Sequence, residues 1–418
     1  MNLPANCIFT FFLLLVANGE AFDTASGSVS ASASAKSKPA RWIACSTTKE
    51  LTRAVKAYIE PGDRVVELGS ALRETSTAIC ETIGPNGQAT LVDVKRSFPK
   101  REDVKRTTAM RREGDDAAFY TDRSKFIEID AFPSWRSALF FNNKDCEVPC
   151  APYDVLVADV SSIVGNDLDL QSVALVKEFL ELNDTINDHD TCCRVVIVKS
   201  GSLSSWARRL VHAQRLISDN ISPSVSSRLS QEKQGADDKV SNRFVPPIVV
   251  GTVGVEEYRR TISYTVKKGN AVIEVGCHLG TSTVDLHSAA FDESKGIGGC
   301  LGVDIGWKII EGARQRHPTV PFEVADAWHA GQLARLGHLL PGSIARDCSG
   351  YDVVYVDVGG LSGSDGLLDS LSLINALGFA LEPNTIVIKS QCIRRLAGNL
   401  VAFSQIWQND EDLRKRIG

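Results

Sequence analysis

Carboxylates and lysines stand at the ends of predicted strands, and the same set occurs twice along the 418-residue chain. In the second half, Asp357 ends the run Tyr-Asp-Val-Val-Tyr-Val-Asp and Lys389 ends the run Thr-Ile-Val-Ile-Lys. Asp159 and Lys199 end the corresponding runs of the first half. A lysine whose pKa is lowered by burial can act as a general base, so each pair is a candidate for deprotonating a hydroxyl group. A structural ion pair at the sheet edge is the alternative interpretation, and for either pair alone it is favoured.

A second candidate site is the turn that comes after the sequence Val-Ile-Glu274-Val-Gly276. Gly276 and Gly280 flank this turn before a predicted helix, and glycine allows the backbone to approach a ligand closely. Asp304, at the end of the next predicted strand, is placed to accept hydrogen bonds from a ribose diol. Glu274 lies two residues before the first glycine, which favours a ligand with a cationic amino acid end and opposes a pyrophosphate.

These residues belong to an ordered set of landmarks that both halves share. The matching pairs are Glu67 and Glu274, Gly69 and Gly276, Asp93 and Asp304, Asp130 and Asp326, Asp159 and Asp357, and Lys199 and Lys389. A shared order of this length indicates a tandem duplication of one α/β domain.

Continuous runs of Val, Ile and Leu predict the strands that hold these residues. They cover 64–68, 89–93, 125–129, 153–159 and 194–199, and then 271–275, 300–304, 321–325, 351–357 and 384–389. Such runs are typical of parallel strands buried on both faces, and alternation with helices gives a doubly wound sheet. We therefore expect two tandem doubly wound α/β domains, over 46–217 and 245–418, joined by a polar linker over 218–244.

The order of the landmarks resembles that of class I S-adenosylmethionine-dependent methyltransferases. The segment Leu-Gly-Val-Asp304-Ile-Gly-Trp-Lys-Ile-Ile-Glu-Gly-Ala-Arg looks like the second-strand segment of that family. The resemblance implies S-adenosylmethionine as the cofactor, with Asp326 beside the adenine and Asp357 in the fourth motif of the family. It covers both halves, roughly residues 46–215 and 245–407.

Both halves depart from the Gly-x-Gly-x-Gly turn of the family. The second half has Gly-x-x-x-Gly with His278 in the middle, whereas the first half keeps only Gly69, and Arg73 would crowd its loop. We therefore expect the second domain to be the better cofactor binder. A nicotinamide-binding Rossmann fold is the competing interpretation, but its Gly-x-Gly-x-x-Gly fingerprint occurs in neither half.

The expected function is that of an S-adenosylmethionine-dependent methyltransferase-like protein acting on an unidentified methyl acceptor. A non-catalytic scaffold of degenerate domains is the first alternative. It is favoured by the degraded glycine turns and by the 29 residues after Lys389, which leave little room for the carboxyl-terminal hairpin of the family.

A third hypothesis is a ribose 2′-O-methyltransferase acting on RNA. Asp357 and Lys389 resemble the central Asp-Lys of the Lys-Asp-Lys-Glu enzymes of that class, and a basic run extends from Lys95 to Arg112. Such a run is more often a solvated loop than a phosphate binder, so an RNA partner is not favoured.

Composition excludes several other classes of protein. A formal net charge of −5 and a hydrophobic content of 43% are typical of a soluble globular chain, not of a disordered or nucleic-acid-coating one. The eleven cysteines form no Cys-x-x-Cys and no Cys/His spacing suited to zinc. Buried, reduced cysteines are therefore expected, and no metal site is predicted.

The first residues of the chain are typical of a targeting signal. The apolar run from Ile8 to Ala17 is about half of the ~20 residues that span a bilayer, and Gly19-Glu-Ala21 is a small-x-small cleavage pattern. We expect a signal peptide over 1–21, a Ser/Ala-rich leader over 22–45 and no transmembrane segment in the mature chain. The leader resembles the bipartite presequence of plastid proteins in algae with secondary plastids, which implies import into a plastid; secretion is the alternative.

Overall fold

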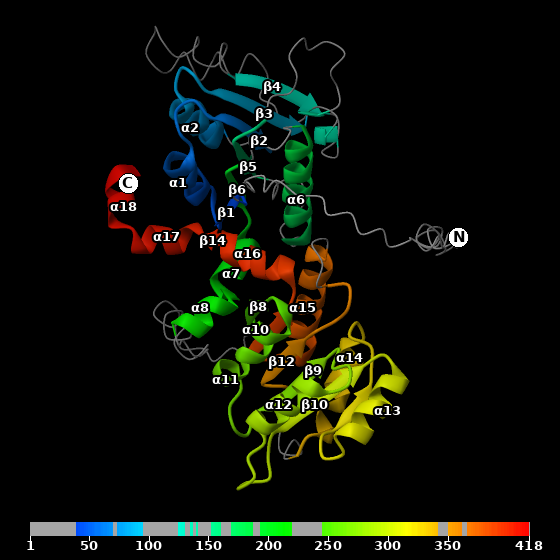
Figure 1. Ribbon diagram of the computed structural model, residues 1–418. Coiled ribbons are helices and arrows are strands. Elements are labelled where there is room, and N and C mark those ends of the chain that lie inside the picture. Colours follow the sequence, from blue (N-terminus) through cyan, green and yellow to red (C-terminus); the bar gives the residue numbers. More distant parts are fainter. Residues whose placement is uncertain are drawn as a thin grey trace, which may run out of the picture. The chain divides into compact units, whose positions relative to one another are not determined.

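The computed structural model, drawn in Figure 1, describes most of the chain from residue 39 onward. The described ranges are 39–69, 73–94, 124–129, 134–136, 139–140, 152–159, 169–186, 193–219, 245–341, 350–361 and 366–417. The expectations for the signal peptide over 1–21, the basic run over 95–112, Asp130 and most of the linker over 218–244 concern residues outside these ranges.

The first sheet has seven parallel strands in the order β14-β1-β6-β5-β2-β3-β4. Its strands are β1 (Arg41–Cys45), β2 (Arg64–Leu68), β3 (Gln88–Val94), β4 (Ser124–Ile129), β5 (Val155–Ala158), β6 (Val195–Lys199) and β14 (Leu400–Ala402). The helices between them are α1 (Thr48–Tyr58), α2 (Arg73–Ile83), α6 (Asp169–Ile186) and α7 (Gly201–Arg209).

The second sheet also has seven parallel strands, in the order β11-β10-β9-β12-β13-β8-β7. Its strands are β7 (Leu210–His212), β8 (Ile248–Thr252), β9 (Ala271–Val275), β10 (Gly299–Asp304), β11 (Phe322–Val324), β12 (Val353–Val356) and β13 (Thr385–Lys389). The helices that come after the strands of this sheet are α8 (Ala213–Ser218), α10 (Gly254–Arg260), α11 (Ile262–Thr265), α12 (Thr281–Ala290), α13 (Trp307–Arg316), α14 (Ala330–Arg335), the 3-10 helix η4 (Leu336–Leu339), α15 (Leu367–Leu381) and α16 (Gln391–Asn399). Two more helices, α17 (Phe403–Asn409) and α18 (Glu411–Ile417), come after β14 of the first sheet.

The two sheets match in register as well as in strand order. Glu67 of β2 lies opposite Leu91 of β3 and Val157 of β5. Glu274 of β9 lies opposite Gly302 of β10 and Tyr355 of β12. Because the side-chain period of a strand is two, a shift of one residue would turn the landmarks to the opposite face. The predicted fold class of two doubly wound α/β sheets is therefore confirmed.

Two elements differ from the domain limits expected from the sequence. Arg41–Cys45, which was expected in the leader, is strand β1 and pairs with β6 along its whole length. The end of the chain, expected in the second domain, supplies β14 to the first sheet, where Leu400 lies opposite Trp42. Short strands of this kind carry a weak sequence signal, because their place depends on a partner far away in the chain.

Buried aliphatic side chains fill both faces of each sheet. The interior strands β5, β6, β12 and β13 are buried along almost all of their residues. This accounts for the continuous Val and Ile runs from which the strands were predicted. Among the described residues, no helix combines the length and the apolar character needed to cross a membrane.

Candidate functional site

The turn between β9 and α12 has an unusual backbone conformation. Gly276, His278 and Gly280 all have positive φ angles, of 83°, 49° and 81°. A Cβ atom on Gly276 would lie 2.2 Å from the carbonyl oxygen of Asp357, and one on Gly280 would lie 2.5 Å from the Phe322 ring. Both glycines are therefore required by packing within the protein, in addition to any ligand that the turn approaches.

Asp304, at the end of β10, connects this turn to the next one. Its Oδ2 atom accepts a hydrogen bond from the backbone N–H of His278 at 3.1 Å, and its Oδ1 atom accepts one from Gly306 at 2.9 Å. The side chain is partly exposed at the carboxyl end of the sheet. A carboxylate has about four lone-pair sites, so both oxygens can still accept hydrogen bonds from a ligand hydroxyl.

Asp326 comes after the neighbouring strand β11 and lies at the same edge of the sheet. Asp304 is opposite Val324 in the ladder, and Asp326 comes two residues after Val324. The Oδ1 atom of Asp326 accepts from the backbone N–H of Trp328 at 3.0 Å, and its side chain is partly exposed. The two acids predicted to contact ribose and adenine are thus carried by the ends of adjacent strands.

Large apolar side chains next to these acids are exposed, and the sequence reasoning missed them. Ile305 is 71% exposed, Trp307 61% and Trp328 47%. They come one to three residues after Asp304 or Asp326, and this proximity in the sequence was the signal that could have found them. Exposed apolar side chains that gather in one place can mark a binding surface.

Glu274 lies inside the core and does not face solvent. Its carboxyl group accepts from the Tyr258 hydroxyl at 3.2 Å and from the Thr283 hydroxyl at 2.5 Å, and the residue is 2% exposed. Burial raises the pKa of Glu274 to about 8. At neutral pH this group is therefore mostly a neutral acid that ties β9 to α10 and α12, so it offers no charge to a cationic ligand.

The predicted pair of Asp357 and Lys389 is formed at the ends of the adjacent strands β12 and β13. The ammonium group of Lys389 donates to the carboxylate of Asp357, and the two side chains are 19% and 24% exposed for lysine and aspartate. The pair therefore reaches solvent. In the first half, Lys199 donates to Asp159 at 3.0 Å, but the Asp159 side chain is only 2% exposed.

The acids of the first half are more deeply buried than their counterparts. Asp93, which corresponds to Asp304, is 1% exposed. Glu67 accepts from Ser76 at 2.5 Å, while its Oε1 atom has no hydrogen-bond partner among the described residues. Leu51 occupies the position that Tyr258 has in the second half, so Glu67 lacks the phenol that serves Glu274. Burial raises the pKa of Glu67 to about 8 as well.

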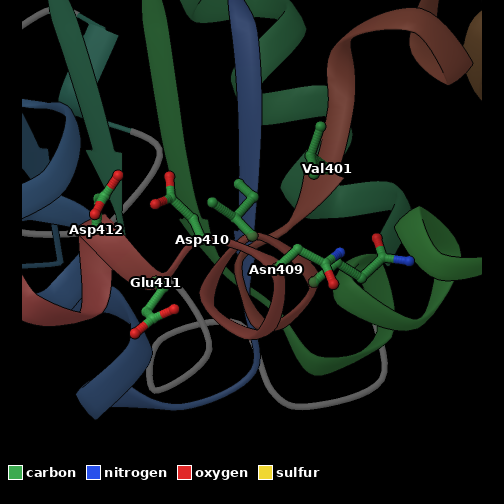
Figure 2. A pocket seen from close by; sticks show the side chains of 7 residues that line it. Val401, Asn409, Asp410, Glu411 and Asp412 are labelled. Atoms are coloured by element: carbon green, nitrogen blue, oxygen red, sulfur yellow. The ribbon is translucent and has the colours of Figure 1, made fainter.

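A separate pocket of about 500 Å³ lies near the end of the chain, as Figure 2 shows. Its lining residues are Val401, Gln405, Ile406, Asn409, Asp410, Glu411 and Asp412. None of the predicted site residues lines it. Asp410 accepts from the backbone N–H of Leu413 at 2.8 Å, so this acid caps helix α18.

No family model matches the chain, and no curated protein matches it. Similar solved structures include DesVI from Streptomyces venezuelae, with 14% identity and a TM-score of 0.21 over 29% of this chain and 43% of DesVI. A complex between the Haloferax volcanii Trm112 methyltransferase activator and a putative methyltransferase gives 19% identity and a TM-score of 0.20, over 28% of this chain and 45% of that one. A TehB-like SAM-dependent methyltransferase from Corynebacterium glutamicum has 19% sequence identity and a TM-score of 0.22. The match covers 46% of this chain and 80% of that one.

This chain thus spans less than half the length of the first two structures that it matches. TM-scores of 0.20 to 0.22 do not establish homology. The function is therefore inferred from the geometry of the second half.

Proposed function

We propose that the second half binds S-adenosylmethionine at the carboxyl ends of β9, β10 and β11. The observation that carries the proposal is the position of Asp304, which holds two turns through backbone N–H groups and keeps its carboxylate partly exposed. In a doubly wound sheet, ligands bind outside the carboxyl ends of the strands, where this carboxylate lies. A ribose diol is the ligand group that such an acid would bind.

Exposed apolar side chains support the same ligand. Ile305, Trp307 and Trp328 offer an apolar surface beside Asp304 and Asp326, which suits an adenine ring with a polar edge. Glu274 takes a structural part in this proposal, because its carboxyl group is buried against Tyr258 and Thr283. Gly276 and Gly280 are required because the turn packs closely against Asp357 and Phe322.

Methyl transfer to a hydroxyl acceptor is the reaction that Asp357 and Lys389 would assist. In the observed arrangement the Lys389 ammonium donates to Asp357, so the amine must lose a proton before it can act as a base. A binding protein without transferase activity is the second candidate, and this ion pair together with the packed glycine turn favours it.

We further propose that the two halves arose by duplication and that the first has lost its ligand site. Equal strand order and equal register support the duplication. The burial of Asp93, at 1% exposure, supports the loss, because a buried carboxylate cannot reach a ribose.

Calorimetric titration of the full chain with S-adenosylmethionine, and with its demethylated product, tests the proposal. Replacing Asp304 with Ala removes a hydrogen bond from a charged group worth about 1.5–3 kcal/mol, which is on the order of a tenfold to hundredfold loss of affinity. The matched change Asp93→Ala should leave affinity nearly unchanged, with folding checked by circular dichroism.

Equal losses from Asp304→Ala and Asp93→Ala would show two working sites. The absence of heat with the unmodified chain would reject binding, and the scaffold hypothesis would then be the better account. A methyl acceptor can be sought only after binding is measured.

A further inference from the structure

Each half of the chain gives its last strand to the sheet of the other half. Strand β7, which comes after β6 and α7, lies beside β8, with Leu210 opposite Val249. Strand β14, which comes after β13 and α16, lies beside β1, with Leu400 opposite Trp42. Both strands run parallel to their new neighbours and occupy the same place in the sheet order, so the exchange is reciprocal.

The exchange includes the helices after β14. Phe403 of α17 is fully buried and Leu413 of α18 is 6% exposed, in a core cluster with Ile43 and Leu51 of the first half. The Arg53 guanidinium lies 4.2 Å from the centre of the Trp407 ring. Residues 400–417 therefore complete the core beside α1, although they are the last residues of the second half.

The helix after β7 does the same in the other direction. Ala213 and Leu216 of α8 are buried in a core cluster with Ile248, Val250 and Tyr258 of the second half. The packed side of α8 is apolar, and the helix contacts both β8 and α10. Residues 210–218 therefore extend the core of the second half, although they come at the end of the first.

The exchanged strands also cover β1 and β8, which would otherwise be the edge strands of their sheets. An uncovered edge strand exposes backbone N–H and C=O groups and invites pairing with other chains. β14 covers β1 and β7 covers β8, so removal of either segment would expose a row of such groups together with an apolar face. Each half thus lacks both a strand and a piece of core when it is considered alone.

We propose that the reciprocal exchange holds the two halves together as an intramolecular pseudodimer. Each half keeps its fold only with the segment that the other half carries. A first half without a ligand site is then still required, because it supplies β7 and α8 to the half that binds and receives β14, α17 and α18 from it.

Amide hydrogen–deuterium exchange of the full chain, measured by mass spectrometry, tests this proposal directly. Phe403→Ala should speed exchange in β1 and α1 by on the order of a hundredfold, because the cavity lies in the first half. Leu216→Ala, the matched variant, should speed exchange in β8, α10 and α11. A Phe403→Ala effect confined to β12 and β13, or a Leu216→Ala effect confined to β5 and β6, would overturn the proposal.

A second measurement leaves every native side chain of the two sheets and their helices in place. A protease site inserted within residues 219–244 allows the purified chain to be cut into two pieces. The pieces should stay together in size-exclusion chromatography and keep the circular dichroism of the uncut chain. Two pieces that separate, each with its secondary structure intact, would show that the exchange is not what joins them.

Discussion

Glu274→Gln is expected to stabilise the protein at alkaline pH, although it removes a charge-bearing group from the core. Burial raises the pKa of Glu274 to about 8, from an ordinary value of 4.5. Between these two values the folded chain holds a proton that the unfolded chain has released. The free energy of unfolding must therefore fall as the pH rises from about 4.5 to about 8.

A pKa shift from 4.5 to about 8 corresponds to about 5 kcal/mol between the two protonation states, of which about 4 kcal/mol is lost by pH 8. Glutamine has the shape of the protonated acid and cannot lose the proton. Its amide can accept from the Tyr258 hydroxyl and donate to Thr283, which replaces both observed contacts. The variant should thus exceed the wild type by several kcal/mol at pH 8 and by less than about 1 kcal/mol at pH 5.

Urea unfolding at pH 5, 6, 7 and 8 measures this difference. The matched variant is Glu67→Gln, since burial raises the pKa of Glu67 to about 8 too and its carboxyl group accepts from the Ser76 hydroxyl. Both variants should flatten the pH dependence, and the double variant should flatten it further. A loss of stability for Glu274→Gln that is equal at pH 5 and pH 8 would show that the folded protein holds an ionised carboxylate, and the reasoning would be wrong.

The geometry and the leader sequence predict three more outcomes. Gly276→Ala should lower the free energy of unfolding by about 1–3 kcal/mol more than Gly254→Ala, measured by thermal unfolding, because its Cβ would strike the Asp357 carbonyl while Gly254, with φ 67°, has no atom within 4 Å. Tyr258→Phe removes the hydroxyl that donates to Glu274 and should cost about 1–3 kcal/mol in urea unfolding at pH 8. Amino-terminal sequencing of the native protein should find residues 1–21 removed, and a chain that begins at Met1 would contradict the expected signal peptide.

The local pattern of the sequence was sufficient for the interior strands of both sheets. Runs of Val and Ile that are buried on both faces have no other stable place than the interior of a parallel sheet, so β5, β6, β12 and β13 could be predicted. The ends of adjacent parallel strands meet at one edge, which is why the pairing of Asp357 with Lys389 could be predicted as well.

The orientation of Glu274 could not be predicted from its neighbours in the sequence. An acid near a strand end can face a ligand or the core, and the choice depends on side chains that other elements bring to it. Tyr258 comes from α10 and Thr283 from α12, and together they give the buried carboxyl group its two hydrogen bonds. A buried polar group persists where partners of this kind exist, and no local periodicity reports them.

The strand exchange could not be predicted either, because β7 and β14 have only three residues each. A segment as short as Leu-Val-His or Leu-Val-Ala fits the edge of either sheet, so the local sequence does not choose between them. The helices after these strands make the choice, because Phe403 and Leu413 fill the core beside α1, whereas Ala213 and Leu216 fill the core beside β8. Burial of the apolar side chains of these helices stabilises each segment in the sheet that it joins.

The proposed exchange gives the first half a structural part in the fold of the whole chain, with no need for a ligand. In the first half Asp93 is buried, and Leu51 stands where the second half has Tyr258, whose hydroxyl donates to Glu274. The residues that receive the last segment of the chain are apolar, and Ile43, Leu51 and Val55 all pack in the cluster that holds Phe403. On the proposed exchange, the half with the exposed acids needs the first half even without a ligand site there, because the first half supplies β7 and α8 and accepts β14.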